Sequence, residues 1–176
     1  DEVFLPNADR LWNANKYEAK LENLSKVIAT GVDMLPTLVG LCEVENEMVV
    51  KDLVNTNNLK PGNYDYVHYD SPDERGIDVA LLYNKKDFKV KSSKAIAVTL
   101  PGEKQDFTRD ILMVNGEILI NGKKEQLFVF VNHWPSRSEG EEVSAPKRAA
   151  AATKLKEVVD SLNAKLDNPN IVIMGD

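Results

Sequence analysis

The stretch Gln126-Leu127-Phe128-Val129-Phe130-Val131-Asn132-His133-Trp134-Pro135-Ser136-Arg137 decides the expected fold. Leucine, valine and phenylalanine favour β-structure, and the run over residues 127–132 is too short for a typical helix, so we expect a buried strand. Pro135 has no N–H to donate to a neighbouring strand, so pairing should end near it. His133 therefore lies where a strand becomes a loop, which is the edge at which ligands bind in open α/β sheets. A histidine at a strand end is weak evidence of function by itself.

The composition is that of an ordinary globular protein. The chain has 176 residues, enough for one domain with its own core, and 43% of them are hydrophobic and 28% charged. A formal net charge of −6 argues against a surface that binds polyanions nonspecifically. A metal enzyme acting on phosphates stays open, because carboxylates bind Mg²⁺ and the bound metal attracts phosphate. The single cysteine, Cys42, excludes an internal disulfide.

The sequence leaves the compartment open. No apolar run approaches the length of a membrane span, and no signal peptide is recognised in the chain, so we expect a soluble protein. The chain begins at Asp1 without a methionine, and we expect that an upstream segment has been removed.

Apolar residues at helical spacing predict two long helices. One covers residues 17–30 and stops at Gly31, and the other covers residues 146–166 with Pro146 in its first turn. Because both carry an apolar stripe, we expect them to cover the outer face of the same sheet. A short helix is predicted over residues 46–56, capped by Asn46.

Short apolar runs between turn residues predict the strands. They cover residues 37–44, 64–69, 77–83, 88–90, 95–100, 108–114, 117–120, 127–132 and 171–174. The dipeptides Asn115-Gly116 and Asn121-Gly122 each predict a hairpin. Strands that alternate with helices at both ends, with hairpins between, predict an α/β layer fold with a mixed sheet.

Polar groups occur where several of these strands end: Glu43, Asp78, His133 and Asp176. A carboxylate at the end of a buried strand is costly unless it is paired or binds a metal. Two carboxylates, a histidine and Arg109 form the inventory for metal-assisted phosphoryl chemistry, in which cations stabilise the phosphate.

Each of these residues also has an ordinary structural explanation. Glu43 could pair with a lysine, Asp176 could be a turn residue, and Arg109 could form a surface ion pair with Asp110. The residue types alone leave these alternatives open.

Five segments resemble motifs of the endonuclease/exonuclease/phosphatase family, in the family's order. No single segment is specific, but the five together are. They are Leu41-Cys42-Glu43-Val44-Glu45-Asn46, Arg75-Gly76-Ile77-Asp78-Val79-Ala80-Leu81-Leu82-Tyr83, Thr108-Arg109-Asp110-Ile111-Leu112, Val131-Asn132-His133-Trp134-Pro135-Ser136-Arg137 and Ile173-Met174-Gly175-Asp176.

The resemblance implies a two-layer β-sandwich flanked by helices, similar to deoxyribonuclease I, and a phosphodiesterase or phosphatase that depends on Mg²⁺ or Mn²⁺. By that resemblance Glu43 would bind the metal, His133 would contact the scissile phosphate and Asp176 would position the attacking water. Arg109 would support Glu43 or the phosphate during catalysis.

Four further residues are candidate substrate contacts by the same resemblance. Asp78 and Arg75 belong to a segment that often lines the family's cleft. Trp134 and Arg137 would set specificity or pack the loop.

The chain also departs from the family pattern. The family opens with a strand that carries an asparagine, and it continues with an asparagine two positions after the aspartate that resembles Asp176 and with a Ser-Asp-His motif. We therefore expect residues 1–176 to be a single partial domain that lacks the first strand and the C-terminal part. Such a chain should be inactive alone, and it should self-associate or be covered by the rest of its domain.

Two functional hypotheses follow. The first is a Mg²⁺-dependent phosphoesterase, and the second is a catalytically inactive fragment or relative that acts as a binding module. The substrate could be nucleic acid, a lipid head group or a small phosphoester, and the acidic composition weighs against long nucleic acid.

Overall fold

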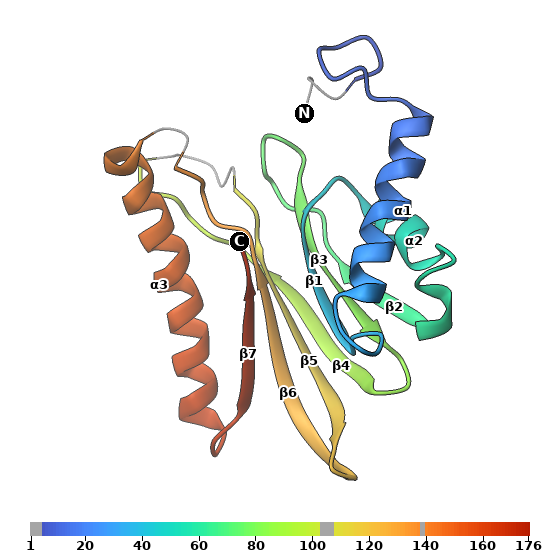
Figure 1. The fold of residues 1–176 in the computed structure, drawn as a ribbon. Coiled ribbons are helices and arrows are strands. Elements are labelled where there is room, and N and C mark those ends of the chain that lie inside the picture. The colour runs from blue at the N-terminus through green and yellow to red at the C-terminus, as the bar shows by residue number, and fades with distance from the viewer. Residues whose placement is uncertain (1–4, 103–107, 138–139) are drawn as a thin grey trace.

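The computed structural model describes residues 5–102, 108–137 and 140–176, which form two β-sheets packed between helices (Figure 1). One sheet has the strand order β1-β3-β2 and the other β4-β5-β6-β7. The strands are β1 (Leu38–Val44), β2 (Tyr64–His68), β3 (Asp78–Asn84), β4 (Phe88–Ile96), β5 (Ile111–Ile120), β6 (Lys123–Asn132) and β7 (Asn170–Gly175). Neighbouring strands are antiparallel except β6 and β7, which are parallel. The predicted two-layer sandwich is confirmed.

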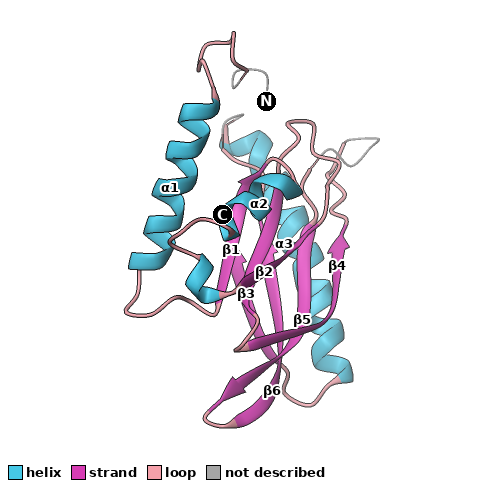
Figure 2. Cartoon of the chain, turned by 90° about the vertical axis from the view of Figure 1, so that its right-hand side faces the viewer, coloured by secondary structure: helices cyan, strands magenta, loops and turns pink. Residues whose placement is uncertain are grey.

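Helices cover both outer faces of the sandwich, in contrast to our expectation. Helices α1 (Ala14–Thr30) and α2 (Glu47–Val54) pack on the three-stranded sheet, together with the short 3₁₀ helix η2 (Lys60–Gly62). Helix α3 (Glu141–Lys165) packs on the four-stranded sheet. In Figure 2, which faces the side of α1 and α2, α2 lies in front of the strands, α1 lies to their left and α3 lies behind them. The prediction that both long helices cover one sheet was wrong.

The reason is that both sheets are apolar on both faces. In β3, Val79 and Leu81 face the other sheet, whereas Ala80 and Leu82 pack toward α1 and α2. In β6, alternate residues divide in the same way between the core among the sheets and the core under α3. A nearly continuous apolar run marks a strand buried on both faces, so each sheet needs its own outer layer of helix.

Three local predictions were also wrong. The Asn115-Gly116 dipeptide lies inside the continuous strand β5, because the ring of Phe88 fills the space above Gly116. A Cβ at Gly116 would lie 2.2 Å from Phe88 Cζ. The strand predicted at 88–90 and the first two residues of the one predicted at 95–100 belong to a single strand, β4, which has a bulge between Val90 and Ser92 and ends at Ile96. Pro146 lies inside α3, which begins five residues earlier with two glutamates that suit a helix N-terminus.

Other predictions were confirmed. Asn46 caps α2 by accepting a hydrogen bond from the N–H of Val49, and Asn121-Gly122 connects β5 to β6. None of the helices in the described residues is long and apolar enough to cross a membrane.

Candidate functional site at one end of the sandwich

His133 and Asp176 lie side by side because β6 and β7 are parallel and end at the same edge. The last strand pair is Asn132 with Gly175. Beyond it, the N–H of Asp176 donates to the carbonyl of Asn132 at 3.1 Å, and the N–H of Trp134 donates to the carbonyl of Asp176 at 2.9 Å. Gly175 permits this close approach: its φ is +144°, and a Cβ there would lie 2.0 Å from the carbonyl oxygen of Asn132.

Glu43 reaches the same end of the molecule from the other sheet. Cys42, its neighbour in β1, donates its Sγ–H to the carbonyl of Asn132 at 3.3 Å, which joins the end of β1 to the end of β6. The pairing of β1 with β3 shifts between Cys42 and Val44, so Glu43 is a bulged residue without a partner in the register. Its φ of +58° lies in the left-handed region, which is uncommon for a residue with a long side chain. Bulges and strained residues of this kind redirect side chains at functional sites.

The electrostatics around His133 show that the predicted residues meet there. The residue is 9% exposed, and its Nδ1 is buried without a hydrogen-bond partner among the described residues. Burial lowers the pKa of His133 below its usual value, and the charges of Arg109 and Arg75 lower it further, while Glu43 and Asp176 act in the opposite direction. The ring is therefore neutral at pH 7, and four charged groups of both signs act on it.

Arg109 holds the turn that carries His133. Its side chain is only 9% exposed, so it is not a surface ion pair. Nε donates to the carbonyl of His133 at 3.1 Å, Nη2 donates to the carbonyl of Trp134 at 2.8 Å, and Nη1 donates to Asp73 Oδ2 at 2.9 Å. The guanidinium places its charge beside the imidazole while it fixes two consecutive carbonyls.

Arg75, rather than a lysine, pairs with Glu43. The distance from Nη2 to Oε1 is 3.5 Å, and the side chains are 46% and 59% exposed. An exposed pair at this distance contributes little to stability. The carboxylate of Glu43 is therefore accessible to a ligand.

The structure brings together Glu43, Arg75, Arg109, His133 and Asp176, but it places the remaining candidates differently. Trp134 packs against the apolar cluster under α3, and its Nε1 donates to Asn132 Oδ1 at 3.4 Å. Arg137 forms an exposed ion pair with Glu141 at the start of α3, at 3.3 Å.

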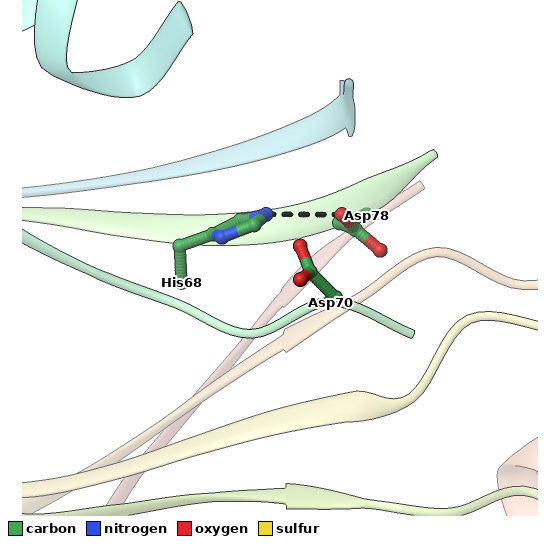
Figure 3. A group of neighbouring side chains, drawn as sticks. All are labelled: His68, Asp70 and Asp78. Atoms are coloured by element: carbon green, nitrogen blue, oxygen red, sulfur yellow. Dashed lines mark hydrogen bonds and ion pairs between the residues drawn. The ribbon is translucent and has the colours of Figure 1, made fainter. Parts of the chain in front are cut away.

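Asp78 belongs to a second polar group, shown in Figure 3, with His68 and Asp70. The ligand atoms of the three residues lie within 4.8 Å of one another, a grouping that could hold a metal ion. Asp78 is already occupied, however. Its Oδ2 lies 3.0 Å from His68 Nε2, and its Oδ1 accepts from the N–H and the Oγ–H of Ser71 at 2.8 and 2.7 Å. The side chains of His68 and Asp78 are 4% and 5% exposed, so this pair is a buried link between β2 and β3.

Sequence reasoning missed His68, Asp70 and Asp73. His68 and Asp70 had a signal, because they lie at the junction of a predicted strand and a polar turn. Asp73 had none, since its partner Arg109 is distant in sequence.

Solved structures share this fold. TDP2 from D. rerio, in complex with a single-strand DNA product, aligns with a TM-score of 0.59 and 16% identity over 93% of this chain and 55% of that chain. The human Nocturnin catalytic domain, with a bound sulfate anion, gives 0.60 and 17% identity over 92% and 56%. The mannosyl-6-phosphatase Bt3783 from Bacteroides thetaiotaomicron gives 0.63 and 17% over 91% and 57%. The chain thus spans little more than half the length of these proteins, and identities this low show the fold alone.

A search of curated proteins gave no match. The model of the endonuclease/exonuclease/phosphatase family, in contrast, matches residues 1–176, the whole of the sequence. The match agrees with the sandwich and with the motifs that meet at its end. The chain belongs to the endonuclease/exonuclease/phosphatase family.

Proposed function

We propose that this chain carries the metal-binding and phosphate-contacting residues of a Mg²⁺-dependent phosphoesterase. Membership of the family supports a phosphoesterase or nuclease type of activity, and enzymes of the family generally use divalent metals. The observation that carries the proposal is the bulge at Glu43. The bulge interrupts the pairing of β1 with β3 and leaves an accessible carboxylate whose charge, like that of Asp176, acts on His133.

The donor set fits a hard cation better at Glu43 than at His68. Mg²⁺ and Mn²⁺ prefer carboxylate oxygens that are free to coordinate. The carboxylate of Glu43 is 59% exposed and weakly paired, whereas the oxygens of Asp78 already accept from His68 and Ser71. A metal in the His68 group would have to displace those bonds.

The roles of the residues follow from their settings. Bound Mg²⁺ would supply positive charge to the phosphate and acidify a water. Because the pKa of His133 is lowered, its ring is neutral and has one donor and one acceptor nitrogen. The donor N–H can form a hydrogen bond to a phosphate oxygen. Asp176 is an exposed carboxylate beside it and can orient the attacking water. Arg109 fixes the His133 turn and adds positive charge next to it.

The substrate is proposed only as a phosphate ester. One neighbour of this fold is complexed with single-strand DNA and another is a mannosyl-6-phosphatase, so the fold supports both nucleic acid and small phosphoesters. Arg75, at the exposed rim beside Glu43, is the residue we propose for contact with the substrate.

The test is hydrolysis of bis(p-nitrophenyl) phosphate and p-nitrophenyl phosphate by the full-length protein, with Mg²⁺, with Mn²⁺ and with a chelator. We expect metal-dependent hydrolysis that Glu43→Gln reduces by about 10²-fold or more, as expected for loss of a charge that stabilises the transition state. Asp70→Asn serves as the matched control and should keep the metal dependence. Hydrolysis that survives the chelator would refute the metal role. Loss of metal dependence in Asp70→Asn alone would move the metal to the His68 group, and metal binding without hydrolysis would favour a binding module.

A further inference from the structure

Asp73 is a buried carboxylate in the turn between β2 and β3. Its side chain is 2% exposed. A buried charge is costly unless it is paired and hydrogen-bonded, so its partners indicate why it is there.

One oxygen of Asp73 faces the four-stranded sheet. Oδ2 accepts from Arg109 Nη1 at 2.9 Å, and the same guanidinium donates to the carbonyls of His133 and Trp134. Three acceptors fix the guanidinium plane, because Arg presents its donors in a rigid fork. Asp73 supplies the charged one of these three.

The other oxygen of Asp73 holds the turn that carries Arg75. Oδ1 accepts from the backbone N–H of Arg75 at 3.0 Å, and the carbonyl of Asp73 accepts from the N–H of Gly76 at 2.9 Å. Gly76 has a φ of +64°, which suits the tight turn. The side chain of Arg75 then reaches Glu43 at 3.5 Å.

We propose that Asp73 is a positioning residue that sets His133 and Glu43 relative to each other, through Arg109 on one side and the Arg75 turn on the other. The side chain of Asp73 bonds to Arg109 and to the backbone of Arg75, so it would act on His133 and Glu43 through these two residues. The catalytic consequence rests on the proposed phosphoesterase function; the positioning itself does not.

The first experiment uses no substrate. The chain has only two histidines, so the imidazole NMR signals of His133 and His68 can be followed separately. Asp73→Asn keeps the size of the side chain and removes its charge. We expect it to shift or broaden the His133 signals and leave those of His68 in place. The matched control is Glu74→Gln, which removes the same charge from the adjacent, exposed position and should move neither.

Two results would overturn the proposal: unchanged His133 signals in Asp73→Asn, or equal changes at both histidines, which would indicate a general loosening of the turn. If Asp73→Asn does not fold, Arg109→Lys decides. This variant keeps a cation beside Asp73 but loses the guanidinium, which holds the carbonyls of His133 and Trp134. The His133 signals should therefore move. Signals identical to those of the unmodified protein would refute the positioning role.

The second experiment measures kinetics on the full-length protein. Misplacement of reacting groups by about 1 Å can cost about 10²-fold. We expect Asp73→Asn to lower kcat by about 10-fold to 10²-fold at saturating metal, and the double variant with Arg109→Lys to be no slower than Arg109→Lys alone, because both changes break one connection. Independent, multiplying effects would contradict this.

The two proposals fail in different ways. If the unmodified protein hydrolyses no phosphoester, the proposed function fails while the NMR comparison still tests Asp73. If the unmodified protein is active and Asp73→Asn retains full activity with undisturbed His133 signals, the positioning role is wrong and the proposed function stands.

Discussion

The two histidines of this chain have opposite settings, although each lies near two carboxylates. His68 Nε2 is bonded to Asp78, which also accepts from Ser71, and the pair is nearly inaccessible. His133 is equally buried, but its Nδ1 has no partner within the described residues, and its pKa is lowered, chiefly by burial. Buried polar groups are almost always hydrogen-bonded, so the exception marks the functional candidate. Both histidines lie near carboxylates, so that feature does not distinguish the structural site from the functional candidate. The ring nitrogen of His133 that has no hydrogen-bond partner in the described part of the chain does distinguish them.

The largest expected effect concerns activity. His133→Asn should lower kcat/KM for phosphoester hydrolysis by about 10²-fold or more, because it removes the group that we propose contacts the reacting phosphate. His68→Asn, measured per folded molecule, should change it by only a few-fold at most. Circular dichroism and urea unfolding of both variants supply the folded fractions. A larger loss in His68→Asn would reverse the comparison.

The next largest effect is a loss of stability on substitution of Asp78, the partner of His68. Asp78→Ala leaves buried donors of His68 and Ser71 without an acceptor, which should reduce the free energy of unfolding by about 3 kcal/mol. Asp176→Ala removes an exposed carboxylate and should change it by about 0.5 kcal/mol or less. Urea denaturation compares the two. Equal losses of unfolding free energy in the two variants would show that Asp176 contributes as much to stability as the buried pair between β2 and β3.

A third substitution, Glu43→Gly, should increase the stability of the fold by a smaller amount. Glu43 occupies a left-handed conformation that costs about 1–2 kcal/mol for residues with a Cβ, and glycine avoids this cost at the expense of extra chain entropy. Glu43→Gly should therefore stabilise the fold by about 0.5 kcal/mol while it abolishes the proposed metal-dependent activity. Glu45→Gly is the control: Glu45 has no positive φ in the described structure, so its replacement should not stabilise. Thermal unfolding of the two variants gives the sign directly.

The smallest effect is the pH dependence from His133. Its folded-state pKa lies below the unfolded value near 6.5, so the unfolded chain binds more protons as the pH falls. The neutral ring contributes its full stability above about pH 6.5, and this contribution declines below that pH until the folded-state pKa is passed. The unfolding free energy of His133→Gln should therefore fall less between pH 7 and pH 5 than that of the unmodified protein. Parallel curves would contradict the burial effect.

Local periodicity predicted the positions of most strands and helices, and the resemblance to the family motifs predicted the two-layer sandwich. Glu43, His133 and Asp176 were identified by their positions after apolar runs, and the structure brings them together. The Asn115-Gly116 turn was wrong because the decisive neighbour, Phe88, is distant in sequence. The side of the sandwich that each helix covers, the bulge at Glu43 and the partner of Asp73 likewise depend on contacts between segments that no local pattern contains.

The bond between Cys42 and the carbonyl of Asn132 has a consequence for folding. It crosses from one sheet to the other, so Glu43 meets His133 and Asp176 only after the two sheets have docked. A chain with one sheet formed would lack part of the proposed ion site, and a cation bound at that proposed site would hold the two sheets together. At a concentration of 100 times its dissociation constant, such a cation would add about 2.7 kcal/mol to the docked state. Amide exchange at the ends of β1 and β6 should then slow when the ion is added, and the ion would report on the last step of assembly.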